Sequence, residues 1–202
     1  VILHYDGVGW RSMDSGVSET LYGIWGAAGD NIFAVGRFGT LLHYDGLAWR
    51  TMESGVQSSL YSVWGASGTD ATAVGWNGVL IHYDGSGWRP SDSNTWRPLY
   101  DVWCIGAEGF AAGFDGLILR RRDGVWTEIR LGDGQLNAVW GNAAKDVWFM
   151  GEGGAAIRYR VASPVVVSGR ITDADGHPIP EATVAFSGDA GFAATGADGR
   201  FT

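Results

Sequence analysis

The stretch Leu21-Tyr22-Gly23-Ile24-Trp25 decides the fold, because close copies of it return three more times along the chain. The copies are Leu60-Tyr61-Ser62-Val63-Trp64, Leu99-Tyr100-Asp101-Val102-Trp103 and Leu136-Asn137-Ala138-Val139-Trp140. Their tryptophans follow one another at intervals of 39, 39 and 37 residues. A period of this length, held over successive copies, indicates an array of equivalent structural units.

A second element, His-Tyr-Asp-Gly followed by a tryptophan, keeps the same period. It starts at His4, His43 and His82, and the next unit reduces it to Arg121-Arg122-Asp123-Gly124. Each unit holds four short runs of β-forming residues that are separated by glycine-rich turns. In the first complete unit we expect strands, lettered a to d, at about residues 20–26, 31–36, 40–44 and 48–52.

Four short strands in about 39 residues are typical of one blade of a β-propeller. The sequence therefore predicts an all-β fold with about four blades of four strands each. They comprise strands c and d of one blade, three complete blades, and strands a to c of another. We expect the parent protein to continue toward its N-terminus; the alternative is a closed four-bladed ring completed by the strand of Trp10. The tryptophans of strands a and d are expected to form the core between blades.

The repeat resembles the bacterial propeller repeats of the Asp-box and photosystem-assembly-factor-like superfamilies. The Asp-box pattern is Ser-x-Asp-x-Gly-x-x-Trp, placed between strands c and d. Asp45, Gly46 and Trp49 match its Asp, Gly and Trp, but the Ser and the residue between Asp and Gly are missing. The resemblance therefore implies the geometry of the superfamily and no specific family within it.

A second module is expected at residues 165–202, after a propeller part at residues 1–162. It contains the pattern G-x-(V/I)-x-D-x-x-G-x-P-I-x-x-A-x-V from Gly169 to Val184, followed by Asp198-Gly199-Arg200-Phe201. This part resembles the carboxypeptidase-regulatory-like domain, although Gly196-Ala197 replaces the usual Thr-Asp. The resemblance implies the start of a small β-sandwich that has no peptidase active site and serves exported and surface proteins as a spacer.

Composition excludes several classes of partner. The 202 residues include 14 basic and 22 acidic residues, which gives a net charge of −8. An acidic chain whose single lysine is Lys145 offers no electrostatic footprint for nucleic acid or anionic lipid. No apolar run is long enough for membrane insertion, and the single Cys104 excludes an intrachain disulfide. We expect an extracellular or cell-surface monomer within a larger multidomain chain, with no cofactor.

Residues that suggest catalysis or metal binding recur once per blade, which favours a structural role. His4, His43 and His82 are expected to lie too far apart to share a zinc ion. Asp173-x-Asp175-Gly176 is expected to form a turn, with weak calcium binding as the alternative. We expect no metal site and no catalytic residues. The aspartates expected to cap the turns between strands c and d are Asp6, Asp45, Asp84 and Asp123.

The candidate binding site lies in the loops between strands b and c, where a Gly-x-x-Gly frame encloses variable residues. These loops and the loops between strand d and the next strand a are expected on one face. An alternative has the aromatic rings packed on the adjacent blade. Asp101, on strand a, is expected near the propeller axis, either solvated or in contact with a ligand. The predicted ligand-binding residues are Arg37, Phe38, Trp76, Asn77, Trp96, Arg97, Asp101, Phe114 and Asp115.

Aromatic rings with polar groups between them suit sugar rings or a protein contact. The sequence therefore favours a non-catalytic binding or scaffold propeller that recognises a glycan or a protein. One alternative is a glycoside hydrolase or sialidase-type enzyme, but strand a supplies no arginine in any copy. The other alternative is a structural spacer or assembly factor, for which the loop aromatics are expected to be buried.

Overall fold

The chain is all-β in the computed structural model, which describes residues 1–130, 133–160, 169–185, 192–198 and 200–201. It divides into two compact units, Val1–Val161 and Ala162–Thr202, which are described separately. The predicted boundary between the two modules, at residues 162–165, lies outside the described residues. No helix in the described parts of the chain has the length and apolar character needed to cross a membrane.

The first complete blade is a four-stranded antiparallel sheet whose strands follow one another in chain order. Its strands are β3 (Leu21–Ala28), β4 (Asn31–Gly36), β5 (Leu41–Tyr44) and β6 (Trp49–Thr51). They match the predicted strands a to d, because the alternation of apolar residues and the glycine turns both act locally. The prediction of a propeller blade is therefore confirmed.

The next two blades repeat this sheet, and a three-stranded sheet follows them. The second blade contains β7 (Leu60–Ser67), β8 (Asp70–Gly75), β9 (Leu80–Tyr83) and β10 (Trp88–Pro90). The third contains β11 (Leu99–Ile105), β12 (Glu108–Gly113), β13 (Leu117–Arg122) and β14 (Val125–Arg130). The last sheet contains β15 (Leu136–Ala143), β16 (Asp146–Gly151) and β17 (Ala156–Arg160), and β1 (Ile2–Tyr5) pairs with β2 (Trp10–Met13) before the first blade.

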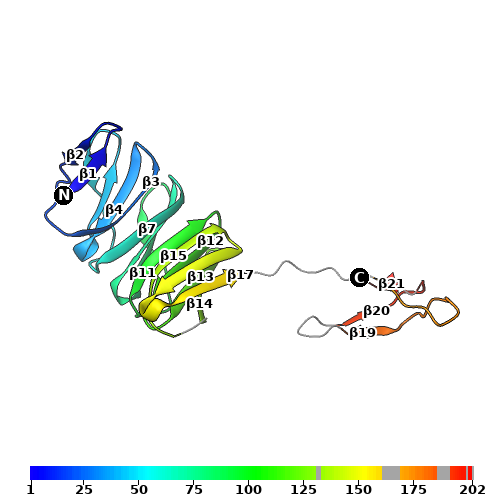
Figure 1. Cartoon of the computed structure of the whole chain (residues 1–202). Helices are drawn as coiled ribbons and strands as arrows, with labels where there is room; N and C mark the ends of the chain where they lie inside the picture. The colour runs from blue at the N-terminus through cyan, green and yellow to red at the C-terminus, as the bar shows by residue number, and fades with distance from the viewer. Residues whose placement is uncertain (131–132, 161–168, 186–191, 199, 202) are drawn as a thin grey trace. The chain divides into compact units, whose positions relative to one another are not determined.

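The blades stack face to face (Figure 1). Apolar side chains between them form the core. Phe33 and Val35 of one blade pack with Val63 of the next blade. The fit is close enough to exclude a side chain at Gly65, because a Cβ there would overlap the indole ring of Trp25. Apolar area removed from water in this way is the main source of stability.

The stack is open, and its two ends differ from the sequence expectation. The β1–β2 hairpin lies at one end and β17 at the other, so the alternative four-bladed ring is not formed (Figure 1). Trp10 and Trp140 are largely exposed, because each stands on the outermost blade. The prediction that the tryptophans of strands a and d are core is therefore wrong for these two residues. Trp49, Trp88, Trp103 and Trp126 are buried.

The described residues of the second unit form two small antiparallel sheets. One joins β18 (Gly169–Arg170) to β21 (Arg200–Phe201), and the other joins β19 (Thr183–Ala185) to β20 (Phe192–Ala194). Residue Gly199 of the predicted motif lies outside the described residues. The complete β-sandwich stays a prediction.

Candidate functional site

The candidate site is formed by the loops that join strand b to c and strand d to the next a, here called the loop face. In every blade, the first glycine of Gly-x-x-Gly lies against the backbone that leads into strand a. A Cβ at Gly75 would overlap the carbonyl oxygen of Ser59, which accepts the N–H of Trp76 at 2.9 Å. The other blades repeat this hydrogen bond from Arg37 to Thr20, from Phe114 to Pro98 and from Glu152 to Gln135.

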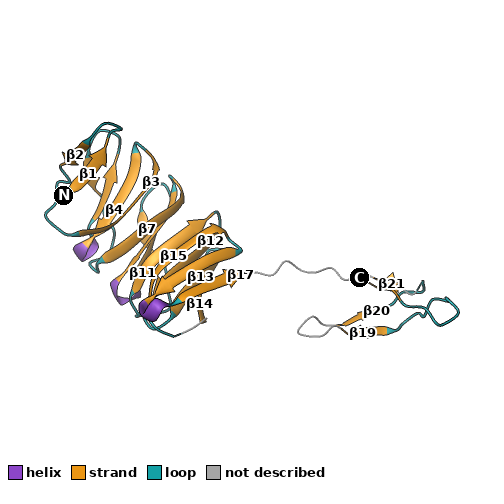
Figure 2. Ribbon diagram, viewed as in Figure 1, coloured by secondary structure: helices purple, strands orange, loops and turns teal. Residues whose placement is uncertain are grey.

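The second glycine fixes the loop from its other side. Gly39 and Gly78 have φ angles of 73° and 68°, and a Cβ at either position would overlap the carbonyl oxygen of Val56 or Thr95. Val56 and Thr95 belong to the loop that follows strand d of the same blade, so the two kinds of loop share one face. Three of these loops form short 3-10 helices along one edge of the stack (Figure 2), namely Arg37–Gly39, Trp76–Gly78 and Glu152–Gly154.

Aromatic side chains project from this anchored backbone into solvent. The exposed fractions are 63 % for Phe38, 49 % for Trp76, 46 % for Phe114 and 75 % for Trp96, which stands on the loop after strand d. Phe38 and Trp96 are mostly exposed, and Trp76 and Phe114 keep about half of their surface exposed, so burial of the rings against the adjacent blade is not observed. Several large apolar side chains gathered on one face are typical of a binding surface.

Two of the predicted polar residues are held by neighbouring side chains. The Arg37 guanidinium lies 4.4 Å from the centre of the Phe38 ring, a cation–π contact. Arg97 donates a hydrogen bond of 3.1 Å from Nη1 to Oε1 of Glu128. Arg37 thus stiffens an exposed ring, and much of the charge of Arg97 is neutralised.

The other two polar residues of these loops share one backbone conformation. Asn77 and Asp115 both have a φ angle of 57°, in the left-handed region that asparagine and aspartate tolerate. Arg130 lies 3.7 Å from a carboxylate oxygen of Asp115. The structure places all the predicted loop residues on the loop face. Their contact with a ligand stays a prediction.

A row of tyrosines was missed by the sequence reasoning. Tyr22, Tyr61 and Tyr100 are the second residues of the repeated stretch, and each stands at a β-bulge between strands a and b. A bulged residue has no partner on the neighbouring strand, and its side chain is re-aimed. The bulges lie directly beside the first loop glycine, as the pairing of Leu60 with Gly75 shows. The repeat itself was the available signal, because a tyrosine occupies this position in three of the four copies.

Asp101 connects three blades. Its carboxylate accepts a hydrogen bond of 2.7 Å from Oγ of Ser62 on β7, and one of 2.8 Å from the N–H of Val139 on β15. The N–H of Val102 donates to it at 3.0 Å. Burial raises the pKa of Asp101, although these hydrogen bonds act in the opposite direction. The expectation of a solvated carboxylate is corrected, because both oxygens accept protein donors.

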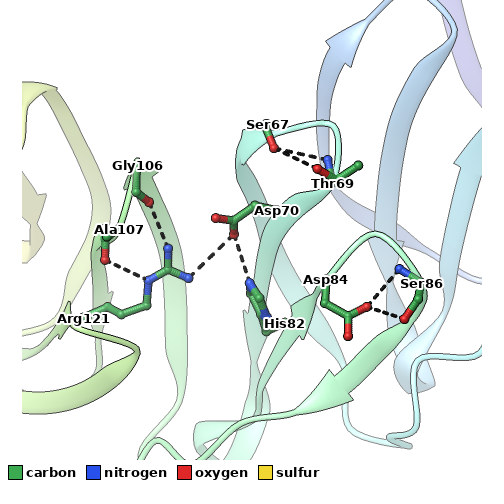
Figure 3. Close-up of polar contacts among 9 residues, drawn as sticks. All are labelled: Ser67, Thr69, Asp70, His82, Asp84, Ser86, Gly106, Ala107 and Arg121. Carbon is green, nitrogen blue, oxygen red and sulfur yellow. Dashed lines mark hydrogen bonds and ion pairs between the residues drawn. The ribbon is translucent and has the colours of Figure 1, made fainter.

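Polar contacts of another kind lie around the turns between strands a and b (Figure 3). These turns are at the opposite ends of the strands from the loop face. Asp70 lies between His82 of its own blade, with Oδ1 and Nε2 3.0 Å apart, and Arg121 of the next blade, 3.8 Å away. Arg121 is buried, and it also donates to the carbonyl oxygens of Gly106 and Ala107 at 3.1 and 3.3 Å. This arrangement explains His43 and His82 as structural groups that tie strand c to strand b. Equivalent pairs are Asn31 with His43, Glu108 with Arg120 and Asp146 with Arg158.

The predicted turn-capping role holds for three of the four repeated aspartates. Asp45 accepts hydrogen bonds of 3.0 and 2.9 Å from the N–H groups of Leu47 and Ala48, and Asp6 and Asp84 repeat this pattern. These bonds, with the guanidinium of Arg50, hold the pKa of Asp45 well below its usual range. These carboxylates are thus occupied by their own turns.

Asp123 differs, because its turn is shorter. Arg122 pairs with Val125, which leaves a two-residue turn in which Asp123 has a φ angle of 51°. The expected hydrogen bonds to the turn do not occur among the described residues. In the same strand, Arg121 pairs with Trp126, as Tyr44 pairs with Trp49 in the first complete blade. Arg121 therefore replaces the tyrosine of the His-Tyr-Asp-Gly element, and the alignment made from the sequence is shifted by one residue.

One cluster of possible metal ligands occurs in the described parts of the second unit. Oxygen or nitrogen atoms of Asp173, Asp175 and His177 lie within 4.8 Å of one another, and all three residues are exposed. Asp173 also accepts the N–H groups of Asp175 and His177 at 3.0 and 2.8 Å. These backbone contacts are those of a turn.

Solved structures show the same fold. YCF48 from Cyanidioschyzon merolae matches 76 % of this chain with a TM-score of 0.60 and 15 % identity. A structure of YCF48 bound to D1 peptide matches 67 % of this chain with a TM-score of 0.52 and 16 % identity. The computationally designed Ika4 protein matches 75 % with a TM-score of 0.62 and 14 % identity, over 96 % of its own length. The present chain spans 61 % and 52 % of the two YCF48 chains. At these identities the likeness shows the β-propeller fold alone.

No protein-family model and no curated protein sequence matches the chain. The resemblances to the Asp-box repeat and to the carboxypeptidase-regulatory-like domain therefore stay predictions.

Proposed function

We propose that this protein is a non-catalytic binding scaffold whose loop face captures a segment of a partner protein. The observation that carries this proposal is the exposure of Phe38, Trp76, Trp96 and Phe114 on loops whose backbone is anchored. Large rings on a rigid backbone gain contact area on binding and lose little conformational freedom. We place the protein outside the cell or at the cell surface, as the sequence predicts.

The carboxylates of Asp101 and of the capped turns support a binding role over an enzymatic one, because protein donors already occupy them. Asp6, Asp45 and Asp84 accept backbone hydrogen bonds of their own turns, and Asp101 joins three strands. A glycoside hydrolase needs two carboxyl groups that face the substrate. The spacer alternative expected the loop aromatics to be buried, whereas they are exposed.

A peptide partner agrees with one of the propellers of similar fold, since YCF48 has a structure with D1 peptide bound. A glycan is the second candidate, because the exposed indole rings of Trp76 and Trp96 also suit sugar rings.

The test is a screen of the whole chain against a peptide array and a glycan array, beside the triple variant Phe38→Ala, Trp76→Ala, Phe114→Ala. The matched control is Leu47→Ala, Val125→Ala, which truncates exposed apolar residues at turns between strands c and d. We expect binding by the native chain and the control, and none by the triple variant, which stays folded. Equal binding by all three proteins, or no binding on either array, contradicts the proposal.

A further inference from the structure

The tyrosine row (Tyr22, Tyr61, Tyr100) runs continuously across the inner strands of three neighbouring blades. The ring centres of Tyr22 and Tyr61 are 5.5 Å apart with the planes at 74°, and those of Tyr61 and Tyr100 are 5.9 Å apart at 22°. Because each residue stands at a bulge beside the loop face, the row extends that face toward the inner strands. A ligand on the exposed loop aromatics would therefore also meet the tyrosines.

The hydroxyl groups of the row are available to a ligand. Within the described residues, none of these three hydroxyls hydrogen-bonds to another protein group, although Tyr61 and Tyr100 are only partly exposed. Tyrosine hydroxyls are protonated at neutral pH and can donate, and burial moves the pKa of Tyr61 and of Tyr100 further above neutrality. Partly buried donors without a protein partner suit acceptors on a ligand.

The charge of the loop face is strongly negative. Its described loops contain seven carboxylates and two guanidinium groups; Arg97 is paired with Glu128, and Asp115 lies 3.7 Å from the guanidinium of Arg130. Besides burial, the negative charge of Glu152 raises the pKa of Tyr100, so Tyr100 of the tyrosine row lies in the negative field of the loop face. The carboxylates are those of Asp14, Glu19, Glu53, Asp92, Asp115, Asp133 and Glu152, and the guanidinium groups are those of Arg37 and Arg97.

We propose that the loop face binds a basic peptide in an extended conformation. Its main-chain carbonyl oxygens accept hydrogen bonds from the tyrosine row, its lysine or arginine side chains meet Glu152 and the other loop carboxylates, and its apolar side chains contact Trp76 and Phe114. An extended peptide presents free carbonyl groups and side chains to alternate sides, as this combination requires. The negative face attracts a basic segment and repels an acidic one. This inference rests on the proposed function and names the chemistry of its partner.

The experiment measures the fluorescence anisotropy of labelled 12-residue peptides, in three pools, as the whole chain is added. The pools share their other positions and carry Lys or Arg, Ser or Gln, or Asp or Glu at four fixed positions; a glycan array is screened in parallel. We expect binding of the basic pool only, weakened by salt. The double variant Tyr61→Phe, Tyr100→Phe is expected to weaken it about tenfold, because each hydrogen bond contributes about 0.5–1.5 kcal/mol. Glu152→Gln weakens it several-fold, and the control Asp123→Asn, which removes a charge at a turn between strands c and d, leaves it unchanged.

Each other outcome overturns the inference. Binding of the acidic or the neutral pool, with loss in the triple loop variant, overturns the basic-peptide inference and leaves the proposed function standing. Binding of a glycan alone, with the same loss, overturns both the basic-peptide inference and the protein partner, and it selects the second candidate instead. Binding of the basic pool that the tyrosine double variant does not weaken overturns the role of the row. Absence of binding to every pool and glycan overturns both proposals. The double variant Tyr61→Phe, Tyr100→Phe keeps both rings and their stacking, so it is expected to fold. Circular dichroism and thermal unfolding verify this.

Discussion

The carboxylate of Asp101 accepts a hydrogen bond of 2.7 Å from the hydroxyl of Ser62, which stands in the neighbouring blade. A second bond, of 2.8 Å, comes from the N–H of Val139 in the blade on the other side. The two contacts connect the inner strands of three successive blades at a half-buried position. A single acidic side chain thus ties together β7, β11 and β15, and the first two of these strands carry Tyr61 and Tyr100.

The Asp101 link predicts a specific dependence of stability on pH. Burial raises the pKa of Asp101 in the folded protein, so the folded state binds the proton more tightly than the unfolded state. This contribution to stability is complete below the unfolded pKa, about 4, and is lost as the pH rises through the folded pKa. The variant Asp101→Asn keeps an acceptor for Val139 and is expected to lose this part of the pH dependence.

Urea unfolding between pH 3 and pH 8 measures the effect. As a second variant, Asp101→Ala leaves the N–H of Val139 without its partner and is expected to lower the free energy of unfolding by about 1–3 kcal/mol. If the free energy of unfolding of Asp101→Asn depends on pH as that of the native protein does, this would falsify the assignment of the pH dependence to Asp101.

The close contact between blades predicts a strong difference between two glycine substitutions. A Cβ at Gly65 would overlap the indole of Trp25, so Gly65→Ala is expected to lower the free energy of unfolding by about 1–3 kcal/mol through overpacking. A Cβ at Gly87 would meet no other atom within 4 Å, so Gly87→Ala is expected to stay within about 0.5 kcal/mol of the native value. Equal midpoints of chemical denaturation for the two variants would contradict the packing described here.

The polar contact between Asp70 and Arg121 predicts a cost for removing a buried guanidinium. Arg121→Met removes the buried guanidinium that donates to the carbonyl oxygens of Gly106 and Ala107 and lies beside Asp70, and is expected to destabilise the protein by about 1–3 kcal/mol. The comparison is Arg158→Met, which removes an exposed ion pair with Asp146 and is expected to have a smaller effect. Thermal unfolding of both variants measures the two losses of stability. A loss of stability for Arg158→Met that equals or exceeds that of Arg121→Met would refute the structural role of the Arg121 contacts.

The turn aspartates predict a loss of stability in acid. Hydrogen bonds from the turn hold the pKa of Asp45 below its usual range, so its contribution is present above the unfolded pKa and is lost as the pH falls through the folded pKa. Asp45→Ala is expected to lower the unfolding temperature at pH 7. In acid, the difference in unfolding temperature between this variant and the native protein is expected to become smaller. Leu47→Ala, in the same turn, is the control and should leave both values unchanged. A constant difference across the pH range would argue against the capping role.

The repeat allowed the blades and the loop face to be predicted, because glycine turns and strand patterns act locally. The sequence could not show that Asp101 reaches Ser62 and Val139, since those contacts depend on how the blades stack. The tyrosine row was missed for a related reason, because a bulge is visible only in the strand pairing. The misjudged turn at Asp123 followed from a one-residue difference in register, which the degenerate Arg121-Arg122 pair concealed.

The central claim is that the loop face is the binding surface, and oxidative footprinting of the whole chain tests it most directly. The chain is oxidised alone and with the peptide or glycan selected on the arrays, and the oxidation of each exposed aromatic residue is measured by mass spectrometry. The account predicts protection of Trp76, Trp96 and Phe114, with Trp10 at the end of the stack unchanged. Protection of Trp10 with unchanged oxidation of the three loop aromatics would contradict it.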